Sequence, residues 1–221
     1  MFRFIVITWV GFILIILSSC NPNNKQITKT IVTKRATKAI KIDSEIVDCN
    51  YTFDQAIAGT KAPNEIIDDL DLISVKYIST DGRIHKGQIL TNKEISSDIK
   101  AIFDTLLSRK FVVERAIPIV KYDWNDDVSM QNNNSYSFCY RNVSFSKHAS
   151  GMAIDINPYF NPVCWGKGYK NRINKPIGAQ RDTTVNGTFY ISLPVLKEFR
   201  KLGFFWGHNF RSKFDDHHFE K

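Results

Sequence analysis

Residues 146–158 read Ser-Lys-His-Ala-Ser-Gly-Met-Ala-Ile-Asp-Ile-Asn-Pro, and this stretch decides how the whole chain is interpreted. It contains two side chains that can bind a metal, His148 and Asp155, with Gly151 between them. A glycine allows the backbone to bend tightly, and the apolar residues directly before Asp155 are typical of a short buried strand. We therefore expect Asp155 to be presented toward His148.

A second group of metal-competent side chains lies in residues 214–220, which read Phe-Asp-Asp-His-His-Phe-Glu. Catalytic zinc has three protein ligands and keeps a fourth position for water. One His and one Asp from the first segment, with one His from the second, would supply that number. A single histidine is more often a satisfied polar residue, however, and a run of Asp and His near a terminus is often solvated surface. Spacing alone leaves both interpretations open.

The detailed pattern resembles the signature of the bacterial zinc D-Ala-D-Ala carboxypeptidase and dipeptidase family, which shares its fold with the hedgehog signalling domain. The pattern S-x-H-x-x-G-x-A-x-D is filled at every fixed position, by Ser146, His148, Gly151, Ala153 and Asp155. The second element of the family is an acid three residues before a zinc histidine, the spacing shown by Asp215 and His218. The resemblance extends from about Leu70 to the end of the sequence.

The resemblance implies a zinc peptidase with a defined set of site residues. His148, Asp155 and His218 would hold the metal. Asp215 would act as the general base, which accepts a proton from the attacking water and passes it to the leaving amine. A purely structural metal site would have no use for this base.

Two further roles and two departures follow from the same comparison. Arg141 matches the substrate-orienting arginine of the family and would stabilise the negative charge that develops on the scissile carbonyl oxygen; an ordinary surface ion pair is the alternative. Ser146 would bind substrate, orient His148 or only cap a loop.

The sequence departs from the family pattern at two positions. Cys139 stands where the family has Asn. His217 stands where the family has Pro, and its imidazole offers a competing metal ligand.

The fold implied by the resemblance is an α+β, hedgehog/DD-peptidase-like single domain with a small, mostly antiparallel sheet and flanking helices. Local patterns agree with mixed elements. The chain is expected to form strands over residues 72–79, 83–90 and 111–120 and helices over residues 96–109 and 192–202. Serines at the start of each helix are available as N-caps.

The N-terminal segment has the pattern of a targeting signal. Residues 4–17 are an uninterrupted apolar run after a short positive segment, too short for a lasting membrane span. Ser18-Ser19-Cys20 resembles the bacterial lipobox, although an ordinary signal peptide with an incidental cysteine is the alternative. We expect residues 1–19 to be a lipoprotein-type signal peptide, Cys20 to be lipidated, residues 20–49 to be a flexible linker and residues 50–221 to be the zinc peptidase domain.

The net charge of +8 does not indicate nucleic-acid binding. Seven basic residues lie in the first 41 positions: Arg3, Lys25, Lys29, Lys34, Arg35, Lys38 and Lys41. The remainder carries only 8 − 7 = +1, whereas a DNA-binding domain needs a clustered basic face of its own. We expect a membrane partner through the lipid anchor and no nucleic-acid partner.

Three cysteines, Cys49, Cys139 and Cys164, remain once Cys20 is lipidated, so at most one internal disulfide can form. An envelope compartment is oxidising, and we expect a bridge between Cys139 and Cys164, which flank the motif. No C-x-x-C spacing is present, which disfavours a zinc ribbon or thioredoxin-type site.

For several other side chains, a role in the site and a simpler structural role are alternatives. Asp126 and Asp127 would form a carboxylate pair or only a turn. Four aromatic residues would line a substrate groove, although core roles are commoner: Tyr159, Phe160, Trp165 and Trp206. His85 and His208 have no partner at ligand spacing and receive no site role.

The expected function is that of a lipid-anchored zinc peptidase of the bacterial cell envelope, facing the periplasm or the cell surface. Its substrate would be the peptidoglycan stem peptide, cut at D-Ala-D-Ala as a carboxypeptidase. One alternative is an endopeptidase of the same family that cuts L-Ala-D-Glu or a cross-link. The other is a non-catalytic, zinc-containing wall-binding module, since fold alone does not settle function.

Overall fold

The two longest strands, β2 (Leu70–Ile78) and β3 (Ile84–Asn92), pair antiparallel along their whole length. The turn between them contains Gly82 at φ +78°, a conformation that favours glycine. The short strand β1 (Ile46–Val47) adds parallel to β3, which gives the sheet order β1-β3-β2. The computed structural model describes residues 45–143, 145–166 and 172–221. The predicted hairpin is therefore present, with strands slightly longer than expected.

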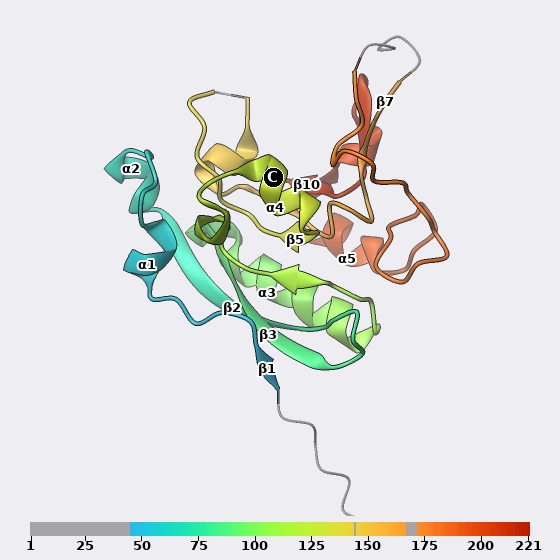
Figure 1. The fold of residues 1–221 in the computed structure, drawn as a ribbon, viewed down its shortest axis with the longest axis horizontal. Helices are drawn as coiled ribbons and strands as arrows, with labels where there is room; N and C mark the ends of the chain where they lie inside the picture. Colours follow the sequence, from blue (N-terminus) through green and yellow to red (C-terminus); the bar gives the residue numbers. More distant parts are fainter. Residues whose placement is uncertain (1–44, 144, 167–171) are drawn as a thin grey trace, which may run out of the picture. The chain divides into compact units, whose positions relative to one another are not determined.

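Helix α3 (Lys93–Ser108) covers one face of this hairpin (Figure 1). Its apolar stripe is buried in the core: Ile95, Ile99, Ile102, Phe103 and Leu106. Burial of this stripe is the main reason that the segment is helical, since isolated helices of this length are marginal. The predicted helix over residues 96–109 starts earlier than expected, because Asn92 and not a serine is the N-cap and accepts a hydrogen bond from the Glu94 amide.

Residues 111–120 do not form the strand that their composition favours. The segment contains only the two-residue strand β4 (Arg115–Ala116), parallel to β5 (Asn134–Ser135), and an isolated parallel bridge of Val112 with Ile78. Side chains take the place of a partner strand here: the Glu114 amide donates to Asn157 Oδ1, and the Ile117 amide donates to Asn134 Oδ1. The segment is therefore held by buried side-chain amides instead of a ladder.

The remaining elements are short, and several of them carry the motif residues. Before and after β4 lie α1 (Phe53–Ile57), α2 (Asn64–Ile67), η1 (Ile119–Tyr122) and α4 (Asp126–Gln131). The motif region contains η2 (Lys147–Ser150), β6 (Ala153–Asp155) and β7 (Val163–Trp165). It is followed by α5 (Leu196–Lys201), β8 (Phe205–Trp206), η3 (Gly207–Asn209), β9 (Lys213–Asp215) and β10 (His218–Glu220).

A second three-stranded sheet is built around β10, in the antiparallel order β6-β10-β8, and a third antiparallel pair joins β7 to β9. The side chain of Phe219, in the middle of β10, is fully buried and stacks on Phe199 with ring centroids 3.9 Å apart. The core beneath this sheet is continuous with the one beneath α3. Separate helices and small sheets agree with the expected α+β class, although strands are divided among several sheets instead of one.

The predictions for residues 1–44 lie outside the described residues, so that only the last residues of the expected linker can be compared with the structure. β1 falls within residues 20–49, which were expected to be linker, and Asp48 contacts Nδ1 of His85 at 2.9 Å. The folded part therefore begins a few residues before position 50. Among the described residues, no helix has the length and apolarity needed to span a bilayer.

The expected disulfide between Cys139 and Cys164 is not formed, and both thiols are free. Cys139 is buried, and its Sγ lies 3.9 Å from the carbonyl oxygen of Trp124, in a separate packing cluster with Ile119 and Tyr136. Cys164 lies on β7, which pairs with β9. Position 139 is thus occupied by a small apolar packing residue.

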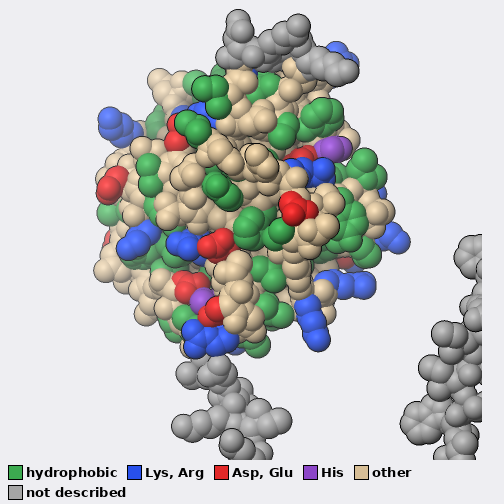
Figure 2. Space-filling model, turned by 45° about the vertical axis from the view of Figure 1, so that its right-hand side comes forward, with side chains coloured by type: hydrophobic (Ala, Val, Ile, Leu, Met, Phe, Trp, Pro, Cys, Tyr) green, Lys and Arg blue, Asp and Glu red, His purple; other side chains and the backbone are tan. Residues whose placement is uncertain are grey.

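Charged side chains on the face shown in Figure 2 are mixed in sign, with Lys and Arg lying among Asp and Glu. Ion pairs between side chains of opposite charge include that of Lys221 with Asp98 at 2.6 Å. This mixture agrees with the near-neutral charge of the sequence after its first 41 residues.

Candidate metal centre

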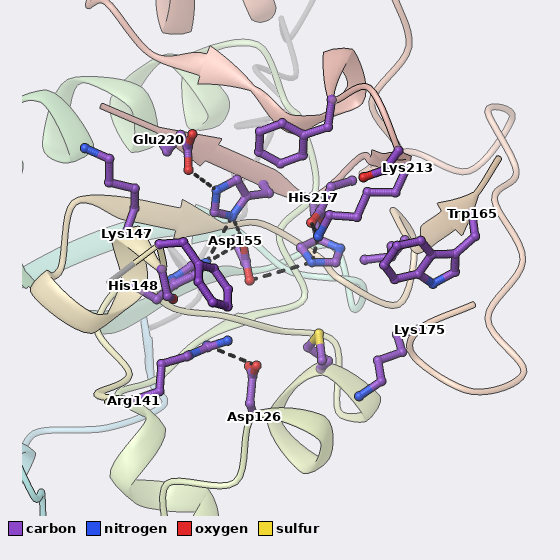
Figure 3. Close-up of a pocket in the computed structure, with 18 of the residues that line it drawn as sticks. Asp126, Arg141, Lys147, His148, Asp155, Trp165, Lys175, Lys213, His217 and Glu220 are labelled. Carbon is purple, nitrogen blue, oxygen red and sulfur yellow. Dashed lines mark hydrogen bonds and ion pairs between the residues drawn. The ribbon is translucent and has the colours of Figure 1, made fainter. Parts of the chain in front are cut away.

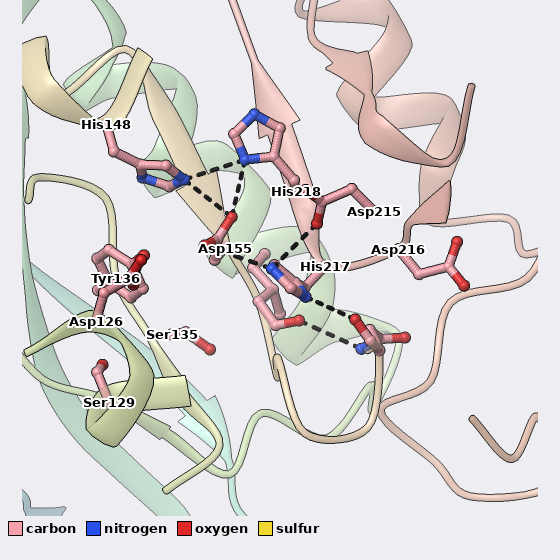
Figure 4. A network of polar contacts seen from close by, with 12 residues as sticks. Asp126, Ser129, Ser135, Tyr136, His148, Asp155, Asp215, Asp216, His217 and His218 are labelled. Atoms are coloured by element: carbon pink, nitrogen blue, oxygen red, sulfur yellow. Dashed lines mark hydrogen bonds and ion pairs between the residues drawn. The ribbon is translucent and has the colours of Figure 1, made fainter. Parts of the chain in front are cut away.

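Three predicted ligands, His148, Asp155 and His218, meet at one buried point (Figure 4). Nε2 of His148 lies 3.1 Å from Oδ1 of Asp155 and 3.0 Å from Nδ1 of His218. Nδ1 of His218 lies 3.0 Å from the same Asp155 oxygen. One atom from each residue therefore borders a common space.

The backbone brings these residues together in two steps. His148 lies in η2, and the chain then turns at Gly151, whose φ of +71° and close approach to Asn92 exclude a side chain: a Cβ there would lie 2.7 Å from the Asn92 amide nitrogen. Strand β6 follows and ends at Asp155. In the antiparallel pairing of β10 with β6, His218 is the direct partner of Asp155. The cross-strand register thus determines the third member of the group.

Hydrogen bonds on the far side of each imidazole fix which nitrogen carries the proton. Nδ1 of His148 lies 2.6 Å from the carbonyl oxygen of Ser137, which can only accept, so Nδ1–H is the donor. Nε2 of His218 lies 3.0 Å from Oε2 of Glu220 and donates to that carboxylate. In the neutral rings, both remaining nitrogens present lone pairs to the same space. Such outer contacts are typical of metal-binding histidines.

The donor set fits a divalent cation. Three acceptor atoms, two neutral nitrogens and a carboxylate oxygen, repel one another at about 3 Å unless a cation or a proton lies between them. Ligands of a tetrahedral zinc ion with bonds near 2.05 Å would be roughly 3.3 Å apart. His148, Asp155 and His218 would hold such an ion after a small expansion of the group.

Without a metal, a proton takes the position between the acceptors. Burial alone would lower the pKa of His218, but hydrogen bonds to Asp155 and Glu220 raise it to about 10. The pKa of Asp155 is held well below its usual value because the nearby charges of His148 and His217 outweigh its burial. The site is therefore strongly attractive to positive charge.

Asp215, the predicted general base, lies at the end of β9, beside the three acceptors. Its pKa is lowered, because the neighbouring His217, His218 and Lys213 outweigh the effect of burial. Oδ1 of Asp215 is buried and accepts no hydrogen bond from the described residues. Nε2 of His217 lies 3.1 Å from this oxygen as an ion-pair contact, so Oδ1 keeps the capacity to accept a hydrogen bond from an incoming water.

The two residues between the predicted base and the third ligand turn in different directions. Asp216 points away from the three acceptors (Figure 4). It forms ion pairs with His208 and Arg181. His217 is buried, with Nδ1 2.7 Å from the carbonyl of Asn161 and Nε2 3.6 Å from Oδ2 of Asp155. His217 does not belong to the group whose ligand atoms converge. The structure thus favours His218 over its neighbour as the third ligand and Asp215 over Asp216 as the base.

Arg141 borders the same cavity and is held by α4. Its Nη2 lies 3.1 Å from Oδ2 of Asp126, whose other oxygen accepts a hydrogen bond from the hydroxyl of Tyr136. Asp127 instead pairs with Lys175 at 2.7 Å, so the two aspartates do not form a carboxylate pair. Asp126 therefore orients the predicted substrate-binding arginine.

The cavity in front of the acceptors has a volume of about 690 Å³ and opens to the surface (Figure 3). Trp165 and Ser146 line it, and the Ser146 hydroxyl does not cap η2. Trp206 does not line the cavity, because it is buried in the core, where its Nε1 donates a hydrogen bond to the carbonyl of Asp216. Tyr159 and Phe160 are also absent from the cavity wall. Of the four aromatic residues expected in a groove, one is present there.

Three residues with contacts to the site were not predicted: Glu220, Lys213 and Asp126 in its role toward Arg141. Alternation along a strand could have revealed two of them. Glu220 is two residues after His218 on β10, and Lys213 is two residues before Asp215 on β9, so each shares a face with a predicted site residue. The contact of Asp126 depends on how α4 packs and has no local sequence signal.

Comparison with protein families gives one match. Residues 141–221 match the family described as D-alanyl-D-alanine carboxypeptidase. The match confirms the expected family. The matched part, somewhat over a third of the chain, contains the three acceptor residues, Asp215 and Arg141. No curated protein and no solved structure gives a significant match.

The match to this zinc peptidase family over residues 141–221 supports a peptidase, and the buried His-Asp-His group is one that could bind a metal. The individual roles of the site residues, the exact substrate and the hedgehog/DD-peptidase fold stay predictions.

Proposed function

We propose that the protein is a zinc-dependent peptidase that hydrolyses peptidoglycan stem peptides, as a D-Ala-D-Ala carboxypeptidase. One observation carries the proposal. Three acceptor atoms converge at about 3 Å, and a buried carboxylate with an unsatisfied oxygen lies beside them. A metal site that served only to stabilise the fold would not need this second feature.

The residues have separate tasks in hydrolysis. Zinc held by His148, Asp155 and His218 would activate a water, lowering its pKa from 15.7 toward about 7, and would polarise the scissile carbonyl. The lowered pKa of Asp215 favours its ionised form, and its Oδ1, which accepts no hydrogen bond from the described residues, would accept the proton of the attacking water. The same carboxyl group then delivers this proton to the leaving amine.

Arg141 would supply the positive charge for the substrate. Its guanidinium lines the cavity and is fixed by Asp126, so that little side-chain entropy is lost when a substrate oxygen binds. Preorganised charges of this kind contribute about 3–4 kcal/mol to transition-state stabilisation per donor. Ser146 lines the cavity and would contact the substrate.

We further propose that the enzyme works at the bacterial cell envelope, anchored by a lipid on Cys20. This rests on the N-terminal sequence pattern alone, since residues 1–44 are outside the described part. The linker expected over residues 20–49 would have a root-mean-square span of roughly 30 Å on flexible-coil scaling, enough to reach wall peptides from a membrane.

Incubation of the zinc-loaded protein, without its first 19 residues, with purified muropeptides followed by mass spectrometry tests the proposal. Loss of one terminal alanine is the expected result. Larger peptide fragments would instead identify an endopeptidase. Binding of zinc and muropeptide without any cleavage would overturn the peptidase and support a wall-binding module.

A further inference from the structure

The carboxylate of Asp215 has two different environments at its two oxygens. Nζ of Lys213 lies 2.6 Å from Oδ2. Oδ1 accepts no hydrogen bond within the described part of the chain, although Nε2 of His217 lies 3.1 Å away. Lys213 therefore distinguishes two oxygens that would otherwise be chemically equivalent.

The ammonium group of Lys213 is itself held in place. In the antiparallel pairing of β7 with β9, Lys213 is the direct partner of Trp165, and its Nζ lies 5.8 Å from that ring centre. The ring of Phe210 lies 5.6 Å from the same nitrogen. Cations within about 6 Å of aromatic rings are attracted to them. Figure 3 shows the Lys213 side chain at this end of the cavity, beside His217 and near Trp165.

We propose that Lys213 is a positioning residue for the general base: it holds Oδ2 of Asp215 and so leaves Oδ1 as the oxygen that accepts the proton. The inference rests on the proposed function, which makes Asp215 the base. It concerns a residue outside the family signature and adds to the roles already described.

Physical chemistry gives Lys213 this role for two reasons. The final torsion of an aspartate is broad and roughly two-fold, so an unrestrained carboxylate rotates easily. A charge-assisted hydrogen bond is short and strong, and it restrains that rotation. Lys213 donates the one side-chain hydrogen bond that Asp215 accepts within the described residues, whereas His217 approaches Oδ1 only as an ion-pair contact at 3.1 Å.

The test compares Lys213→Met, Lys213→Arg and a matched control, Lys221→Met. Lys221 also forms a 2.6 Å ion pair, with Asp98, lies 5.0 Å from an aromatic ring and is exposed to a similar extent, but it is outside the cavity. We expect Lys213→Met to lower kcat on muropeptides by roughly 10-fold with KM and zinc content unchanged. Arginine should restore most of kcat, and the control should behave as the wild type.

A second measurement does not depend on activity. Crystal structures of the zinc-loaded wild type and of Lys213→Met should show Asp215 in one orientation in the former and in a rotated or divided orientation in the latter. An unchanged Asp215 in the variant, a kcat equal to that of the Lys221→Met control, or loss of zinc from the variant would overturn the proposal. A wild type that cleaves no muropeptide would refute the proposed function, and the crystal structures would still decide whether Lys213 orients Asp215.

Discussion

His218 and Asp155 are direct partners across two antiparallel strands, and their side chains approach to 3.0 Å between Nδ1 and Oδ1. The pairing register of the two strands thereby brings together residues that are 63 positions apart in the sequence. Because a shift of one residue would turn His218 to the opposite face of β10, the register of this pair is a condition for metal binding.

The choice between adjacent histidines is testable by metal analysis. His218→Ala should reduce the zinc content from about one ion per chain to none, because it removes one of three ligands. His217→Ala should keep its zinc, since Nε2 of His217 lies beside Asp155 but outside the converging group. The reverse result would mean that the third ligand is wrongly identified.

Glu220 is expected to strengthen metal binding without touching the metal. Its carboxylate accepts the Nε2 proton of His218 and so keeps the Nδ1 lone pair directed at the site. Glu220→Gln should weaken zinc affinity by about 10–100-fold, measured by competition with a chelating dye. Glu198→Gln, which changes a surface carboxylate on α5 that pairs with Lys201, is the control. Equal affinities for both variants would contradict this role.

The general base should be separable from the metal site. Asp215→Asn should retain zinc and lose activity by a factor on the order of 10² or more, because the amide cannot accept the proton. Inductively coupled plasma mass spectrometry and a muropeptide assay on the same sample would show both properties. If activity survived, Asp216 would become the candidate base, although its side chain points toward His208 and Arg181.

Asp126 should act through Arg141. Asp126→Asn removes the charge that orients the guanidinium, and we expect kcat/KM to fall by roughly 10-fold while zinc content stays constant. The neighbouring Asp127→Asn, which affects only an exposed ion pair with Lys175, should have a smaller effect, since such pairs contribute little. A larger loss in Asp127→Asn would argue against the orienting role of Asp126.

The metal-free protein should lose stability at alkaline pH. Burial alone would lower the pKa of His218, but hydrogen bonds to Asp155 and Glu220 raise it to about 10, above the value of about 6.5 in an unfolded chain. Its contribution to stability is therefore fully present below about pH 6.5 and is lost as the pH rises through about 10. Urea unfolding with EDTA and with zinc would show this loss only in the metal-free sample, because zinc replaces the proton. Equal losses in both samples would refute the explanation.

Much of the fold could be predicted where one local pattern decided the structure. Alternating residues predicted β2 and β3, and the apolar stripe of α3 predicted its buried face. The segment 111–120 was predicted wrongly because its backbone amides are satisfied by Asn157 and Asn134, which are distant in the sequence. The predicted helix over residues 192–202 shortens to α5, since residues 190–195 form separate turns.

The candidate site also consists of residues that the sequence predicts and of contacts that it does not predict. The resemblance to the family signature selected His148, Asp155, Asp215 and His218, which the structure brings to one cavity. The contacts that surround them could not be read from the motif, because they depend on strand register and on packing: the carbonyl of Ser137 for one histidine and the ammonium of Lys213 for the base. The expected Cys139–Cys164 bridge failed for the same reason, since flanking a motif does not bring two thiols together.

The side chains of β10 point to alternate sides of one short strand. Phe219 packs in the core, and His218 and Glu220 face the candidate metal centre on the other side. Without the ion, only a shared proton would hold these acceptors together on the side of β10 opposite the aromatic stack, so loosening one side would loosen the other. Loss of the metal would then reduce the resistance of the protein to proteolysis.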